Sequence, residues 1–268
     1  MADRGFDAEW AALTLGIKPA LRRTVDPAEA DAVTAQLTAR GAKVTRATSL
    51  ARIGGRDVAV LYAARALRDA EALRDAEAPV LPGAPHTEHG AAQHREVGRR
   101  LGFPGCCVDA FCERVARGVD TLPDGTRGLA EDYVALRAAW VDRADARTNN
   151  LRMSSRRQLV SHYPCRYDCA WSIRYADALL TALARRDAAA ADALLADLAR
   201  PMAVAPDGSR ATISLDATRV VTAAEALSPR DEDLARALVG AAVAPDGRVV
   251  DRRAPPAWAV CFQRDSTP

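Results

Sequence analysis

The distribution of the cysteines is the feature that most constrains this chain. Six cysteines occur in 268 residues, none of them before position 106, and five fall into two groups. In "LGFPGCC", Cys106 and Cys107 follow a proline–glycine pair, and in "SHYPCRYDC", Cys165 and Cys169 have the spacing C-x3-C. If the two groups bind one metal, the fold must bring together two segments that are distant in the sequence.

The absence of targeting signals predicts the compartment in which these thiols work. No apolar run reaches the about 18 residues of a membrane span. The start "MADRGFDAEW" lacks the basic beginning and the apolar core of a secretory signal. We therefore expect a cytoplasmic protein, in which thiols stay reduced and clustered cysteines indicate metal or redox chemistry rather than disulfides.

The first pair is predicted to lie in the first turn of a helix that starts at Pro104 or Gly105. The free N–H groups and the dipole of a helix start favour the thiolate, which is the form that binds metals. Adjacent cysteines there point in different directions, which suits two irons of one cluster better than one zinc. Cys107 is the preferred ligand, since Cys106 could pack against the core instead.

The second pair combines two local signals. Pro164 fixes the backbone ahead of Cys165, and Cys169 is predicted to open the next helix. The spacing C-x3-C also arises by chance on helices, so the pair indicates a metal only together with the first pair.

The two remaining cysteines are predicted to be structural. Cys112 shares an apolar stripe at helical spacing with Val108, Phe111 and Val115, which indicates core packing. Cys261 follows the strand-like "WAV" and is predicted to be a buried strand residue.

The predicted cofactor is an iron–sulfur cluster, [4Fe–4S], held by Cys106, Cys107, Cys165 and Cys169, with zinc as the alternative. The pattern is neither the CxxC…CxxC of a zinc ribbon nor the CxxCxxC of a ferredoxin. If Cys107, Cys165 and Cys169 alone bind, one iron stays open. Such an iron is able to act as a Lewis acid or to hold an exogenous sulfur.

Polar residues near the cysteines are candidates for further roles. His162 is a fourth ligand, an acid–base group or a hydrogen-bonded structural histidine, and Arg156 is expected to handle substrate charge. Asn149 and Asn150 are predicted to cap or turn the chain, with substrate binding as the alternative. Two further groups of residues are predicted to be structural. The first, an alternative metal site, is His86, Glu88, His89 and His94; the second, an alternative anion site, is Arg152, Arg156 and Arg157.

Proline and glycine divide the chain into three predicted parts. The fold class expected is α+β and predominantly helical: a small α/β domain in 1–80, a helical metal-binding domain in 86–200 and an α+β extension in 201–268. Prolines in "PVLPGAP" mark the first boundary, and two Pro-Asp-Gly turns predict hairpins in the last part. Predicted helices are 26–40, 67–78, 90–101, 104–117, 129–143, 170–185, 187–199 and 229–239, and predicted strands are 43–48 and 57–62.

The charge balance limits the partners. A formal charge of +2, from 37 basic and 35 acidic residues, does not produce the basic footprint of a nucleic-acid-binding protein. We expect a small-molecule substrate, and neither nucleic acid nor membrane as a partner. The abundant alanine and arginine are typical of a GC-rich genome, for which we expect a role in specialised metabolism.

Together the two segments resemble an uncharacterised prokaryotic family, a domain of unknown function, that carries GYP-x-CC-x3-F followed by H-x-PC-x3-C. The matching residues are Gly102, Phe103, Pro104, Cys106, Cys107 and Phe111, then His162, Pro164, Cys165 and Cys169. Phe103 stands where that family has tyrosine, and the likeness covers roughly residues 95 to 180. The resemblance implies no activity, but it implies that these residues occur as a unit and share a site.

The sequence thus predicts an iron–sulfur enzyme that acts on a small molecule by sulfur transfer or Lewis-acid chemistry. Two alternatives remain: a zinc-stabilised binding module, and a thiol redox protein in which Cys165 and Cys169 form a reversible disulfide.

Overall fold

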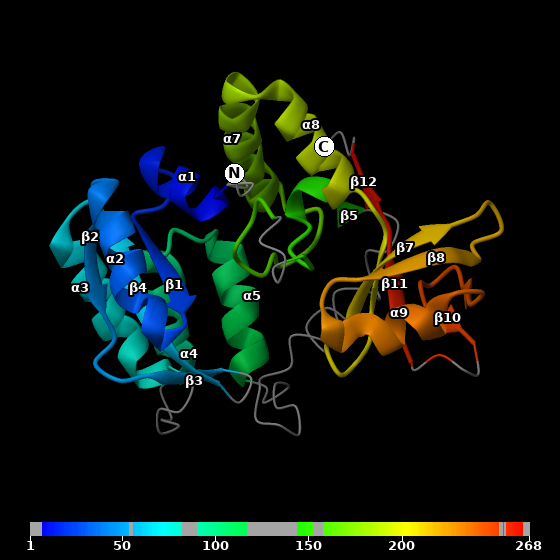
Figure 1. The fold of residues 1–268 in the computed structure, drawn as a ribbon, viewed down its shortest axis with the longest axis horizontal. Coiled ribbons are helices and arrows are strands. Elements are labelled where there is room, and N and C mark those ends of the chain that lie inside the picture. Colours follow the sequence, from blue (N-terminus) through cyan, green and yellow to red (C-terminus); the bar gives the residue numbers. More distant parts are fainter. Residues whose placement is uncertain are drawn as a thin grey trace. The chain divides into compact units, whose positions relative to one another are not determined.

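The computed structural model describes residues 7–53, 56–81, 90–116, 144–152, 158–251, 254 and 256–264. The chain forms two compact units, Glu9–Thr126 and, together with Met1–Ala8, Arg127–Pro268. Each unit has its own sheet (Figure 1). Each also has its own buried apolar residues.

The sheet of unit Glu9–Thr126 is antiparallel and has its longest strand in the middle. The central strand β4 (Arg56–Ala64) pairs with β1 (Ala20–Val25) on one side and β2 (Lys43–Arg46) on the other, and β3 (Ala51–Ile53) pairs with the start of β4. The predicted strands over "KVTRAT" and "DVAVLY" are confirmed as β2 and β4. The uninterrupted apolar run of β4 suits a strand that is covered on both faces.

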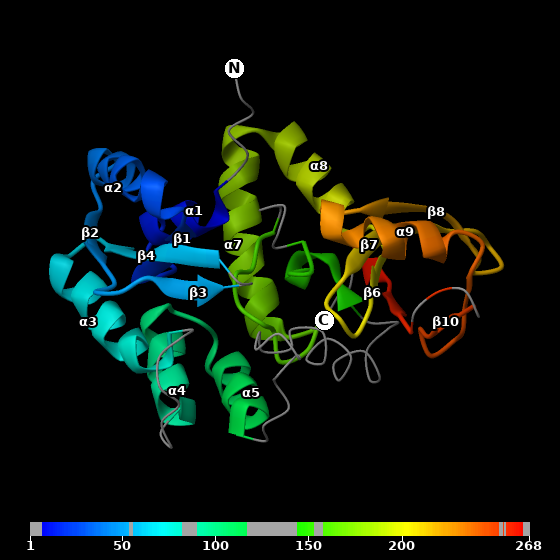
Figure 2. The same cartoon turned by 60° about the horizontal axis from the view of Figure 1, so that its bottom comes forward.

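Four helices cover this sheet: α1 (Ala8–Thr14), α2 (Ala30–Ala39), α3 (Leu67–Glu77) and α4 (Gly90–Arg100). Tyr62 of β4 is buried in a cluster with residues of α3 and α4, whereas its neighbour Ala63 joins a cluster with residues of α1 and α2. Figure 2 shows α2 on one side of the strands and α3 and α4 on the other. The alternation of side chains along a strand produces these two separate cores.

Helix ends in this unit lie at residues whose backbone preferences favour them. The Asp26 side chain accepts a hydrogen bond from the Ala28 amide at 2.8 Å and opens the 3₁₀ turn η1 (Pro27–Glu29), which leads into α2. Gly41, with φ +93°, follows the end of α2, and Gly102, with φ +72°, follows the end of α4. Both glycines occupy the left-handed region that terminates helices.

The second unit contains a four-stranded antiparallel sheet. Its order is β11 (Trp258–Val260), β6 (Met202–Val204), β7 (Arg210–Leu215) and β8 (Val221–Ala226). Residues of α9 (Glu232–Leu238) share a buried cluster with these strands.

Both Pro-Asp-Gly hairpins are confirmed. One joins β6 to β7, and the other joins β9 (Ala242–Val243) to β10 (Val249–Val250). Ser228 is the N-cap residue of the 3₁₀ turn η5 (Pro229–Asp231) that precedes α9. Its hydroxyl donates to the Asp231 carboxylate at 2.7 Å and makes no side-chain capping bond to the backbone.

The same unit holds the two helices predicted after the second cysteine pair, α7 (Ala170–Arg186) and α8 (Ala188–Leu198). Before them come β5 (Ala144–Asp145) and the 3₁₀ turn η3 (Ala146–Thr148). Far along the sequence, β12 (Phe262–Gln263) pairs in parallel with β5.

The expectation of a predominantly helical chain is wrong. Helices hold 46% and strands 23% of the residues described, which is a mixed α+β composition. The missed strands β3, β5 and β12 have only two or three residues. The longer β1 carries Arg22 and Arg23, which interrupt the apolar alternation that marks a strand. The helix predicted over 129–143 lies outside the described residues, and the division into three domains remains a prediction.

Candidate metal centre

The first cysteine pair lies at the start of α5 (Gly105–Ala116), as predicted. The amides of Cys107 and Val108 both donate to the Pro104 carbonyl, at 2.9 and 3.0 Å. Cys107 is buried and Cys106 is exposed, with 3.9 Å between their sulfur atoms. Cys106 therefore does not pack into the core, which was the alternative considered for it.

Two close approaches fix the position of α5. A Cβ on Gly98 of α4 would lie 2.7 Å from a methyl of Val108, so the two helices touch where Gly98 has no side chain. A Cβ on Gly102 would meet Pro19 Cδ at 2.8 Å and the Ile17 carbonyl at 3.2 Å. The turn "LGFPG" thus lies directly against the segment before β1. This contact fixes the position of the turn and therefore of Cys106, which follows it.

A buried lysine adds to this contact. Lys18 is 1% exposed, forms an ion pair with Glu9 at 2.5 Å, and its ammonium lies 4.8 Å from the centroid of the Phe103 ring. Burial lowers the pKa of Lys18, and the Glu9 carboxylate opposes that shift. The ion pair with Glu9 therefore offsets part of the cost of burying this amine.

The second cysteine pair lies in a loop and at a helix start. Cys169 is the N-cap residue of α7. Its amide donates to the Arg166 carbonyl at 3.1 Å, and its carbonyl accepts from the Ile173 amide at 2.9 Å. Cys169 is buried and Cys165 is half-buried. The prediction that Cys169 opens the next helix is confirmed.

Hydrogen bonds from β5 and η3 hold the loop that carries Cys165. The Asn150 amide donates to the His162 carbonyl at 2.9 Å, and the Thr148 hydroxyl donates to the Tyr167 carbonyl at 2.7 Å. The Asp145 backbone amide donates to the same Tyr167 carbonyl at 2.9 Å. The loop from His162 to Tyr167 is thus held on both sides of Cys165.

His162 is embedded in the protein. It is 3% exposed, Nε2 lies 2.8 Å from the Ser172 hydroxyl, and the ring packs edge-on against Tyr175 with 5.6 Å between centroids. These contacts favour the structural interpretation of His162, and its acid–base role stays a prediction. Arg156, the other predicted catalytic residue, lies outside the described residues.

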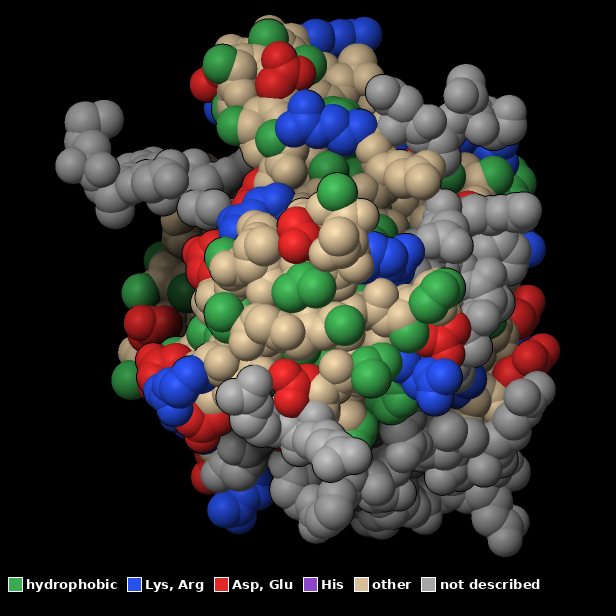
Figure 3. All heavy atoms as spheres, turned by 90° about the vertical axis from the view of Figure 1, so that its right-hand side faces the viewer, with side chains coloured by type: hydrophobic (Ala, Val, Ile, Leu, Met, Phe, Trp, Pro, Cys, Tyr) green, Lys and Arg blue, Asp and Glu red, His purple; other side chains and the backbone are tan. Residues whose placement is uncertain are grey.

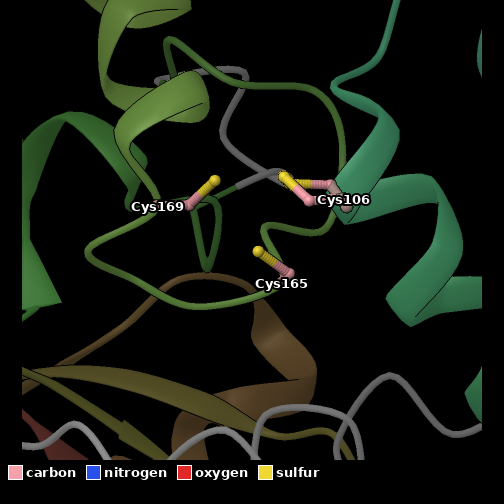
Figure 4. A group of neighbouring side chains, drawn as sticks. Cys106, Cys165 and Cys169 are labelled. Carbon is pink, nitrogen blue, oxygen red and sulfur yellow. The ribbon is translucent and has the colours of Figure 1, made fainter.

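The four predicted ligands come together. The sulfur atoms of Cys106, Cys107, Cys165 and Cys169 all lie within 4.8 Å of one another, and the four cysteines could bind a metal ion. Figure 4 shows the sulfurs of Cys106, Cys165 and Cys169 turned toward a common centre, from the start of α5, from the loop and from the start of α7.

The other two cysteines are not part of this group of four. Cys112 is buried in α5, as predicted, and burial raises the pKa of its thiol, which favours the neutral form. Cys261 is half-buried and lies between β11 and β12, so its prediction as a buried strand residue is wrong.

The remaining polar candidates have separate places. His94 packs edge-on against Phe111, with 5.4 Å between ring centroids, whereas His86, Glu88 and His89 lie outside the described residues, as does Arg157. Arg152 was expected on a solvated face, but it is 4% exposed and forms an ion pair with Asp197 at 3.0 Å.

Sequence reasoning missed the buried polar segment from Asp145 to Asn150. Asp145, Thr148, Asn149 and Asn150 are each fully buried. Asn149 does turn the chain, since its side chain accepts from the Leu151 amide at 3.1 Å. The available sequence signal was the pair Asn149–Asn150. Buried asparagine amides are rare unless they are hydrogen-bonded, so such a pair, once buried, must hold neighbouring segments by hydrogen bonds.

Comparisons with known proteins add no relative. None of the helices described is both long and apolar enough to cross a membrane. No family model, no curated protein and no solved structure matches this chain.

Proposed function

We propose that the protein is a metalloprotein in which Cys106, Cys107, Cys165 and Cys169 hold one metal centre. The observation that supports it is the convergence of four sulfur atoms within 4.8 Å, from two segments that are distant in the sequence. Thiolates are strong ligands for zinc and for iron–sulfur clusters. The binding energy of such a centre would add to folding energy, because the ligand set exists only in the folded chain.

The spacing of the sulfurs favours a single ion. Four thiolates at about 2.3 Å from one tetrahedral zinc lie about 3.8 Å from one another. The Cys106–Cys107 distance is 3.9 Å and no pair exceeds 4.8 Å. In a [4Fe–4S] cluster each thiolate binds a different iron, and the irons and sulfides between them hold the thiolates farther apart. A closed set of four thiolates on one zinc would make the site structural.

An iron–sulfur enzyme is the second candidate, and the unequal burial of the first pair favours it. Cys107 and Cys169 are buried whereas Cys106 is exposed, so Cys106 is the ligand that a substrate could replace most easily. A cluster on these cysteines would supply Lewis-acid or sulfur-transfer chemistry to a small molecule. In this candidate His162 and Arg156 keep their predicted roles in proton and charge handling.

We propose a small-molecule substrate for the enzyme candidate and no substrate for the zinc candidate, with neither nucleic acid nor a membrane as a partner. A reducing cytoplasm would keep the thiols in the reduced form that binds a metal. On the face seen in Figure 3, basic and acidic side chains alternate rather than gathering into one basic stripe. This supports the expectation drawn from the net charge of +2.

The test is anaerobic purification of the full chain, followed by an absorption spectrum and analysis of zinc, iron and sulfide. One zinc and a colourless protein support the single-ion proposal. A broad band near ~400 nm with about four irons and sulfide supports the enzyme candidate. A protein that contains no metal contradicts both candidates. The remaining hypothesis is then a thiol redox protein with a reversible Cys165–Cys169 disulfide.

Paired variants test whether the centre is shared. The double variant Cys106→Ala/Cys107→Ala and the double variant Cys165→Ala/Cys169→Ala should each lose nearly all of the metal if one centre needs both pairs. If each double variant instead keeps about half of the metal of the parent protein, the pairs bind separately and a shared centre is refuted.

A further inference from the structure

We infer that Asn150 is a positioning residue of the metal centre, which it serves by fixing the loop that carries Cys165. This inference rests on the proposed function. Asn150 is fully buried, and its side-chain amide donates to the His162 carbonyl at 2.9 Å. Because a carbonyl only accepts, the NH₂ group of Asn150 must face it, and the orientation of the side chain is fixed.

The bond to His162 reaches both ends of the cysteine segment. The His162 carbonyl lies three residues before Cys165, and the His162 ring contacts the hydroxyl of Ser172, three residues after Cys169. Asn150, His162 and Ser172 therefore form a buried chain of hydrogen bonds that brackets both ligands. His162 is buried, so the bond of its carbonyl to Asn150 is costly to lose.

Metal sites depend on such outer contacts. Ligands that are held in place before the metal arrives lose less conformational freedom on binding. Removing an outer-shell partner typically weakens metal affinity about 10- to 100-fold. We expect a loss of this size when the Asn150 amide is removed.

The neighbouring residue supplies a matched control. Asn149 is also fully buried and also donates one side-chain hydrogen bond to a backbone carbonyl, that of Leu198 at 2.7 Å. Leu198 ends α8 and not the cysteine loop. Asn149 also accepts from the Leu151 amide at 3.1 Å, so its replacement should destabilise the unit at least as much as that of Asn150.

The experiment compares Asn150→Leu, Asn149→Leu and the parent protein. Each is loaded with zinc, and transfer of the metal to a chromogenic chelator is followed over time. Urea unfolding and the thiolate-to-metal absorption bands of the cobalt form are recorded in parallel. We expect Asn150→Leu to release zinc about 10- to 100-fold faster, with altered cobalt bands, while Asn149→Leu keeps the parent rate and bands despite its lower stability.

Equal release rates in the two variants would overturn the inference, because the loss would then follow general stability. If Asn150→Leu does not fold, Asn150→Ser carries the same expectation, since its smaller side chain avoids overpacking but does not reach the carbonyl. If the parent protein itself binds no metal, the proposed function fails, and that result differs from a parent that binds metal with equal variants.

Discussion

Replacing Gly102 by alanine tests whether the turn before the first cysteine pair is fixed by close packing. Gly102 has φ +72°, and a Cβ there would lie 2.8 Å from Pro19 Cδ and 3.2 Å from the Ile17 carbonyl. The proline ring and the backbone oxygen have little freedom to move away. Gly41 offers the matched control, since it has φ +93° and a Cβ there would meet nothing within 4 Å.

The two substitutions differ in one contribution. An alanine in the left-handed region costs about 1–2 kcal/mol. Loss of freedom in the unfolded chain returns about 0.4–1 kcal/mol, so Gly41→Ala should cost about 1 kcal/mol. Gly102→Ala adds the overpacking, which typically costs about 1–3 kcal/mol. We therefore expect a loss of about 3 kcal/mol for Gly102→Ala.

Urea unfolding of both variants measures this difference. Gly41 and Gly102 lie in the same compact unit, so both changes should affect the same transition. Equal losses of about 1 kcal/mol would refute the reasoning, because they would show that the turn yields to the added methyl group. A larger loss for Gly102→Ala, together with weaker metal retention, would show that the turn positions Cys106 and Cys107.

Two further predictions concern groups outside the proposed ligand set. Cys112→Ala should keep the full metal content of the parent, because the Cys112 thiol is buried in α5 and burial raises its pKa. Elemental analysis measures this, and a loss of metal would place Cys112 among the ligands. Asp216 accepts hydrogen bonds from the Val220 amide and from Thr218, which hold the pKa of Asp216 below its usual value. A lowered folded-state pKa stabilises the protein fully above the unfolded pKa of about 3.9 and loses this effect as pH falls through the folded pKa. Asp216→Asn should therefore lower the urea midpoint at pH 7 and flatten its decline below pH ~4, and an unchanged pH profile would contradict this.

The sequence allowed prediction of the local boundaries because single residues set them. Asp26 and Pro27 start a helix, Gly102 ends one, and the Pro-Asp-Gly turns close hairpins, each by a preference of the backbone at that residue. The grouping of the four cysteines was predictable because two cysteine pairs occur in one chain, although the spacing C-x3-C alone also arises by chance on helices.

The rest depends on partners that are distant in the sequence. The pairing of β5 with β12 and the ion pair of Arg152 with Asp197 leave no local pattern. Short strands of two or three residues also show no periodicity, and this is why the strand content was underestimated. The carbonyl partners of Asn149 and Asn150 could not be read from the sequence for the same reason.

The parallel pair of β5 and β12 bears on the order of events during synthesis. Phe262 of β12 packs edge-on against Tyr167 in the cysteine loop, with 5.2 Å between ring centroids, and its strand pairs with Ala144 beside the residues that hold this loop. After Cys169 has been synthesised, the ribosome must still synthesise the chain as far as Phe262 before these contacts can form. Loading of a metal onto a fully supported loop would therefore follow the synthesis of Phe262, well after that of the four cysteines.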